Sequence, residues 1–294
     1  MVGSTLLDIR RHVDALATPR GPYAVVCGRT GCEPSPVTGL RFDDRDTAAE
    51  AADAASEYRA TLRQYDPQVL FYEPLVHDVE DAPRGDVIED RTDERVRYLS
   101  FCHDVAGATF EALSAAGLRD VESAAMETYL TLAEVVTDPD DFCLTLLWSV
   151  TSELARLTGR REQTAVVASA ASALRCHDVD TTGRPAAGLE AALDHLEAVG
   201  FLDAHAVESA ADEAGWRIRL DGYALAERTG RLPTLPVSIA LARQLPTTPF
   251  RLADATPLDD HTWQLRIEPD RVPGGLASLD ARNDRRLYDR NTDR

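Results

Sequence analysis

Apolar residues recur at helical spacing at the start of the chain, and a strand-like run follows them. The helical stripe consists of Leu6, Leu7, Ile9, Val13 and Leu16. Prolines and a glycine within positions 18–22 are expected to end this helix. The run "YAVVC" (23–27) is rich in β-branched and aromatic residues and predicts a strand, and "VTGLRF" (37–42) is its expected hairpin partner.

An alanine-rich segment and another strand-like run follow. Asp46 or Thr47 is expected to cap the helix that the alanine-rich segment predicts. Residues 69–78 predict a strand, which Pro74 confines to a sheet edge because proline has no backbone N–H to donate. We therefore expect residues 1–79 to form a small N-terminal α/β sandwich-like module.

The middle of the chain changes in composition and in period. Residues 80–95 are acidic, contain proline and glycine, and predict a linker. From residue 96 to residue 176, four apolar stripes repeat with helical periodicity and are separated by short polar breaks. Four helices with short connections predict an antiparallel helical bundle over 96–176.

The last part of the chain mixes helical and strand periods. Residues 186–269 predict a helix, two strands, a short helix and a hairpin around Asp259-Asp260. The tail, residues 270–294, carries dense mixed charge and is expected to be mobile. Together the segments predict an α+β fold class.

Residues 191–225, "AALDHLEAVGFLDAHAVESAADEAGWRIRLDGYAL", combine a leucine-rich helix, a glycine exit and two short strands. This order resembles the last helix and the wing of winged-helix domains, such as those of prokaryotic transcription regulators. The resemblance implies a winged-helix-like C-terminal part in which arginines on and after the wing would contact nucleic acid. These arginines are Arg217, Arg219, Arg228 and Arg231.

The helix that would enter the DNA groove departs from this pattern. It carries Glu190, Asp194 and Glu197 and no arginine, so it would repel phosphate groups. A winged-helix-like shape that contacts another protein fits these charges better than one that reads DNA. Nucleic acid stays an alternative partner, and another protein is the preferred one.

Charge is the strongest signal in the composition. The formal net charge is -19, from 50 acidic and 31 basic residues, and every basic residue is arginine because the chain has no lysine. This bias is typical of proteins from salt-loving archaea, where molar salt shortens the Debye length to about 3 Å and screens the repulsion among carboxylates. The acidity argues against a broad basic face for nucleic acid.

The sequence indicates no membrane segment. No apolar run reaches the roughly 18 residues that a membrane span needs, and the N-terminus reads as an amphipathic helix, not as a signal peptide. We therefore expect a cytoplasmic protein.

The turn after "YAVVC" is a candidate anion site. Gly28, Arg29 and Gly31 could direct two backbone amides and a guanidinium at a small anion. A P-loop is excluded because the glycine spacing is too short, no lysine is present, and prolines stand where the helix should begin. The alternative is a hairpin or Ω-like turn without a ligand.

Cysteine and histidine do not form a recognisable metal or catalytic pattern. The five cysteines are an odd number scattered along the chain, and the doublets Cys102-His103 and Cys176-His177 hold neighbours that diverge on a helix. The same divergence prevents "FCHDVAG" (101–107) from acting as a nucleophile, base and orienting acid. We therefore expect no metal, no cofactor and no catalytic residue.

Four short stretches point to a family. "VVCGRTG", "GLRFDDRDTAAEAA", "YRATLRQYDP" and "GRLPTLP" are similar to a family of haloarchaeal proteins of unknown function. The similarity spans most of the chain. It implies a cytoplasmic protein of a salt-loving organism and assigns no activity, ligand or site residue.

These observations favour a non-enzymatic cytoplasmic regulatory or adaptor protein that acts through protein contacts. Two alternatives stay open, a winged-helix DNA-binding regulator and a module that binds a small anion at the turn between Gly28 and Gly31.

Overall fold

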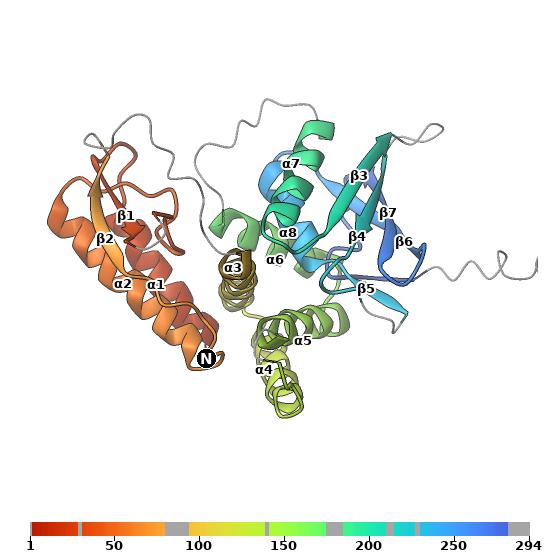
Figure 1. Ribbon diagram of the computed structural model, residues 1–294, viewed down its shortest axis with the longest axis horizontal. Coiled ribbons are helices and arrows are strands. Elements are labelled where there is room, and N and C mark those ends of the chain that lie inside the picture. The colour runs from red at the N-terminus through yellow and green to blue at the C-terminus, as the bar shows by residue number, and fades with distance from the viewer. Residues whose placement is uncertain are drawn as a thin grey trace, which may run out of the picture.

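The computed structural model describes residues 2–28, 31–79, 94–138, 141–174, 185–209, 215–226 and 230–281. These residues contain eight helices and eight strands, and all the sheets are small and antiparallel, so the α+β class is confirmed. In Figure 1 the N-terminal module lies on one side of helix α3 (Glu94–Ala115) and the largest sheet lies on the other side.

The N-terminal module consists of α1 (Val2–Leu16), β1 (Tyr23–Cys27), α2 (Arg45–Arg63) and β2 (Pro74–Asp78). β1 pairs with β2, with Tyr23 opposite Asp78 and Cys27 opposite Pro74. The predicted hairpin between β1 and residues 37–42 is wrong, because that segment meets β1 only at the bridge between Tyr23 and Phe42.

The path of the chain before that bridge explains the difference. Residues 35–39 form turns in which the Val37 N–H donates to the Pro34 carbonyl at 2.9 Å. The segment therefore curls up instead of running along β1. The strand predicted over 69–78 is also shorter than expected, because it begins only at Pro74.

Helix α2 begins earlier than expected. Asp44, not Asp46 or Thr47, is its N-cap, and the Asp44 carboxylate accepts the Thr47 N–H at 2.8 Å. This hydrogen bond lowers the pKa of Asp44. The buried face of α2 is built largely from alanine, which lets neighbouring elements approach closely.

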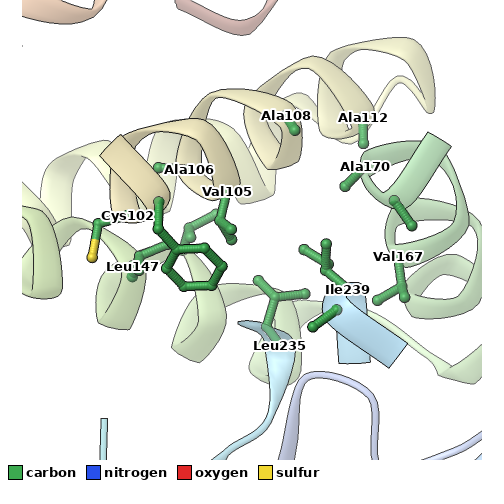
Figure 2. Packing of buried hydrophobic residues seen from close by; sticks show 14 of the residues in the cluster. Cys102, Val105, Ala106, Ala108, Ala112, Leu147, Val167, Ala170, Leu235 and Ile239 are labelled. Carbon is green, nitrogen blue, oxygen red and sulfur yellow. The ribbon is translucent and has the colours of Figure 1, made fainter. Parts of the chain in front are cut away.

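The four predicted helices of the middle segment are present as α3, α4 (Arg119–Ala133), α5 (Asp141–Leu157) and α6 (Arg160–Ala173). Helix α3 is central, because it packs against α1 of the N-terminal module and against α4, α5 and α6. Its buried residues include several small ones, among them Ala106, Gly107, Ala108 and Ala112. In Figure 2, Ala108 and Ala112 of α3 lie near Ala170 of α6.

The C-terminal part contains one larger sheet. Helix α7 (Pro185–Ala198) leads into β3 (Ala204–Ser209) and β4 (Trp216–Asp221), and β6 (Phe250–Pro257) and β7 (Thr262–Pro269) form the expected second hairpin. The strand order is β3-β4-β7-β6. The β3–β4 hairpin is therefore part of a four-stranded sheet, and its resemblance to a wing stays a prediction.

Short helix α8 (Leu235–Gln244) stands in the chain between the β3–β4 and β6–β7 hairpins. It begins with Pro236 in its first turn, where the missing N–H costs nothing, and it packs against α6 and α7. Leu235 and Ile239 of α8 point into the core that α3, α5 and α6 also line (Figure 2).

The prediction that residues 270–294 form a mobile tail is partly wrong. Residues 278–280 form strand β8 (Ser278–Asp280), which pairs with β5 (Arg231–Pro233). Residues 282–294 and most of the expected linker, residues 80–93, lie outside the described residues. None of the helices in the described part of the chain is long and apolar enough to cross a membrane.

Candidate functional site

The predicted anion turn is built as a turn. The Gly28 N–H donates to the Glu73 carbonyl at 2.9 Å, and the Gly31 N–H donates to the Cys27 carbonyl at 2.7 Å. Gly31 has a φ of 71°, a conformation that favours glycine. Because both amides already have carbonyl partners, the geometry favours the turn without a ligand. Arg29 lies outside the described residues, and its role stays a prediction.

The arginines predicted to contact nucleic acid do not form a basic face among the described residues. Arg219 on β4 pairs with Asp221 at 3.0 Å, and Arg231 on β5 pairs with Asp280 at 3.2 Å. Arg217 is exposed on β4 opposite Glu208 of β3. Arg228 lies outside the described part of the chain, so this site also stays a prediction.

The acidic residues of α7 have a partner inside the protein. Asp194 lies 3.5 Å from Nε2 of His205 on β3, and Glu197 lies 2.8 Å from Nδ1 of the same ring. Two carboxylates of the helix that resembles a recognition helix are thus directed at the following hairpin.

The residues of "FCHDVAG" separate as helix geometry requires. Cys102 is buried, and burial raises the pKa of its thiol. His103 pairs with the buried Asp66 at 2.6 Å, and Asp104 pairs with Arg59 at 2.6 Å. The three side chains therefore lie in three different environments. The described residues also contain no group of three or more metal-ligating side chains.

A cavity of about 240 Å³ lies where the N-terminal module meets the rest of the protein. The N-terminal module contributes Tyr72 and part of the loop 32–38, and α3 contributes one wall. The other sides are closed by Leu174 at the end of α6, by His195 of α7 and by Arg243 of α8. Six segments of the chain therefore meet at this cavity.

Arg243 and His195 form its polar end. Nη1 of Arg243 lies 3.1 Å from Nε2 of His195 and donates to it. Burial, and then the positive charge of Arg243, lower the pKa of His195 to about 4. His195 is therefore neutral near pH 7, with its proton on Nδ1, as the contact with Arg243 requires.

The guanidinium of Arg243 has a second buried N–H donor. Its Nε is buried and has no hydrogen-bond partner within the described residues. The two acids that line the cavity are engaged elsewhere, because Glu33 accepts from Arg41 at 2.8 Å and Asp104 accepts from Arg59. A second guanidinium, from Arg97 of α3, also lines the cavity.

The remaining wall is largely apolar. It includes Val96, Phe101, Val105 and Val199, and the ring of Phe101 packs edge-on against His195 with 5.9 Å between the ring centres. An apolar wall with a cationic end suits a small organic anion. A histidine with a pKa of about 4 is a poor general base near pH 7, so the arrangement suits binding better than proton transfer.

The sequence predictions did not include this cavity. Its polar residues stand in different segments, and no local spacing connects His195 with Arg243 or either residue with Tyr72. The available signal was Arg243 itself, a charged residue near the end of the apolar helix "LPVSIALARQL".

The fold and the cavity define an α+β protein in which a small N-terminal module and a larger helical and sheet part meet at a cavity. Two family models match the chain: Domain of unknown function (DUF7552) over residues 5–80 and Domain of unknown function (DUF7551) over residues 98–282. The chain belongs to the DUF7551 family, whose model spans more than half of it. The expected membership in a family of unknown function is thus confirmed.

No curated protein and no solved structure matched the chain. The cavity takes its walls from both matched regions, since Tyr72 lies in the first region and His195 and Arg243 lie in the second.

Proposed function

We propose that this protein is a non-enzymatic regulatory protein that binds a small organic anion in the cavity between its two parts. The observation that carries the proposal is the buried Nε of Arg243, which has no partner in the described structure and belongs to a residue that lines a largely apolar cavity. A carboxylate that bound there would satisfy this donor, and its apolar body would contact Phe101 and Val105. With about 240 Å³, the cavity suits a small metabolite.

Binding at this position would link the two parts of the protein. A ligand that touches Tyr72 and Arg243 at once stabilises the docked arrangement and favours whatever surface that arrangement presents. We propose that this surface contacts another protein, as the sequence favours for a regulatory or adaptor protein.

The test is a thermal-shift and calorimetric screen of small carboxylates with apolar bodies, carried out in potassium chloride at high ionic strength. At least one carboxylate should bind the wild type, and Arg243→Gln should weaken it roughly tenfold or more because a charge-assisted hydrogen bond is lost. Arg45→Gln is the matched control, because Arg45 is exposed at the start of α2 and does not line the cavity. Equal weakening by both variants, or turnover of a bound compound, would contradict the proposal.

We further propose that the protein works in the cytoplasm of a salt-loving archaeon and that its β3–β4 region contacts protein and not DNA. The charge of -19 and the absence of lysine support the first point. The pairing of Arg219 with Asp221, and the position of Arg217 opposite Glu208, support the second. A DNA-binding assay at high potassium concentration tests it, and binding that disappears in an Arg217→Ala/Arg219→Ala variant would favour the DNA-binding alternative.

A further inference from the structure

A second, smaller cavity lies between α2 and the segment that leads into β2. Its volume is about 100 Å³, and its lining includes Arg59 and Arg63 of α2 and Phe71 and Tyr72 of the following segment. Its described lining contains two arginines and no aspartate or glutamate, although acids outnumber basic residues by 50 to 31 in the whole chain. The lining of the cavity is therefore positively charged in an acidic protein, although Asp104, outside the lining, pairs with Arg59.

Arg59 is the central group of this cavity. Its side chain is 2% exposed, and only Nη2 has a hydrogen-bond partner, the Asp104 carboxylate at 2.6 Å. Its Nε and Nη1 are buried without a partner in the part of the chain that the structure describes. Buried N–H groups without acceptors are costly and rare in native proteins, so two on one guanidinium indicate an absent acceptor.

Aromatic rings hold both guanidinium groups in place. The Cζ atom of Arg59 lies 4.6 Å from the ring centre of Tyr72, and that of Arg63 lies 3.8 Å from the ring centre of Phe71. A guanidinium that stacks on a ring keeps its N–H edge available for an acceptor in its own plane. The two arginines are four residues apart and so share one face of α2.

The positive charges of Arg59 and Arg63 also repel each other. Burial, and then the charge of Arg59, lower the pKa of Arg63. Arg63 donates to the Leu70 carbonyl at 3.3 Å, a neutral acceptor that does not compensate its charge. An anion beside both side chains would remove this repulsion and supply the acceptor that Arg59 lacks.

We propose that this cavity binds one small free oxyanion of the phosphate or sulfate class. One of the two unpartnered N–H donors of Arg59, at Nε or Nη1, donates to one of its oxygens, and the guanidinium of Arg63 provides the second positive charge. The cavity of about 100 Å³ is well below the size of a pocket for a drug-sized organic ligand, which favours a free ion over the phosphate group of a larger molecule. This proposal is independent of the organic-anion cavity and of its proposed function.

The test is isothermal titration of the full chain with inorganic phosphate, with the ionic strength held constant by potassium chloride. Wild type should bind phosphate or sulfate, and Arg63→Gln should bind roughly tenfold or more weakly because one charged donor is lost. Arg45→Gln removes the same charge from an exposed position of the same helix, and Arg243→Gln removes it from the larger cavity. Both controls should bind phosphate as the wild type does.

A second variant tests the guanidinium fork. Arg59→Lys keeps the charge but loses the fixed, planar N–H donors of the guanidinium, so its phosphate affinity should also fall by at least roughly tenfold. If Arg59→Lys fails to fold, the comparison of Arg63→Gln with Arg45→Gln still decides the matter. Absence of phosphate and sulfate binding by the wild type, or wild-type affinity in Arg63→Gln, would overturn the proposal. Equal binding of glycerol phosphate would overturn the assignment to a free ion.

Discussion

Glu111 joins three helices at a single buried carboxylate. It stands on α3 and accepts hydrogen bonds from Arg10 of α1 and from Tyr58 of α2. Burial raises the pKa of Glu111, although Arg10 opposes this shift. Burial also works against the charge of Arg10, but Tyr58 and Glu111 together raise the pKa of the guanidinium. The contact therefore requires both partners to be charged and in place.

We expect Glu111→Gln to lower the free energy of unfolding by about 3 to 5 kcal/mol, because it leaves the buried Arg10 without its counter-charge. Tyr58→Phe removes one hydrogen bond and should cost about 1 to 2 kcal/mol. Urea denaturation measures both. Asp8→Asn is the control, since Asp8 and its partner Arg11 are both exposed and the change should cost about 1 kcal/mol or less. Similar losses in Glu111→Gln and Asp8→Asn would contradict this account.

His195 should make stability depend on pH in a definite direction. Its pKa is about 4 in the folded protein against an ordinary value of 6.5, so the unfolded chain binds its proton more readily. The contribution of neutral His195 is complete above pH 6.5 and is lost as the pH falls toward 4, with a total of up to about 3 kcal/mol.

Denaturation at several pH values tests this prediction. His195→Gln cannot take up the proton, so the part of the slope between pH 4 and pH 6.5 that depends on His195 should disappear in this variant. An unchanged slope in His195→Gln would assign the pH dependence to other groups.

At the scale of elements, two glycines set how closely helices approach. A Cβ atom on Gly3 of α1 would lie 2.3 Å from the Phe110 carbonyl oxygen of α3, and one on Gly107 of α3 would lie 2.7 Å from the Tyr58 hydroxyl. The N–H of Gly3 also donates to the Glu122 carboxylate of α4 at 2.9 Å. Helix α1 therefore docks on α3 through backbone contact as well as through its apolar stripe.

Gly3→Ala should destabilise the protein by about 1 to 3 kcal/mol, because the added methyl group meets backbone that cannot turn away. Gly274→Ala is the matched control, since its nearest neighbour would be a side-chain carbon of Arg251 at an ordinary 3.6 Å. Chemical denaturation compares the two variants. Equal stability of Gly3→Ala and wild type would show that α1 can shift away from α3 without cost.

The helices were predictable one by one, but their neighbours were not. A stripe of apolar residues shows which side of a helix is buried, and this was sufficient for α1 and for α3 to α6. The partner of β1 was predicted wrongly because the nearer strand-like run, residues 37–42, is the simpler hairpin partner. Residues 35–39, which include Pro36, form turns instead, and β1 pairs with β2.

At the scale of the whole molecule, the N-terminal module and the remainder share one core. The buried side chains form a single cluster that runs from Val2 of α1 to Ala277 near β8. Because α1 packs against both α2 and α3, the two regions matched by separate family models are not separated by an open gap. This continuous core is what allows a cavity to form between them.

The charge of -19 belongs to this scale, because it acts over the whole surface. We expect the midpoint of thermal unfolding to rise as potassium chloride increases from low to molar concentration, since salt screens repulsion that is strongest in the compact state. Differential scanning calorimetry measures this midpoint. A midpoint that falls over the same range would show that attraction between charges, and not repulsion, dominates the surface.

The sequence by itself determined the α+β class, most of the helices and the acidic character of the protein. These properties follow from local periodicity and from composition, which need no knowledge of distant neighbours. It also predicted a turn at Gly28 to Gly31, which the hydrogen bonds of both amides favour.

Only the tertiary structure decided where the candidate sites lie. Arg243 meets His195 across 48 positions, and Arg59 meets Asp104 across 45 positions, so neither pair leaves a pattern in the sequence. The physical reason is that burial removes water from these groups, and burial is a property of the assembled fold. Most arginines lie on the protein surface. An arginine becomes a candidate binding residue when the fold buries its N–H groups and leaves them without an acceptor.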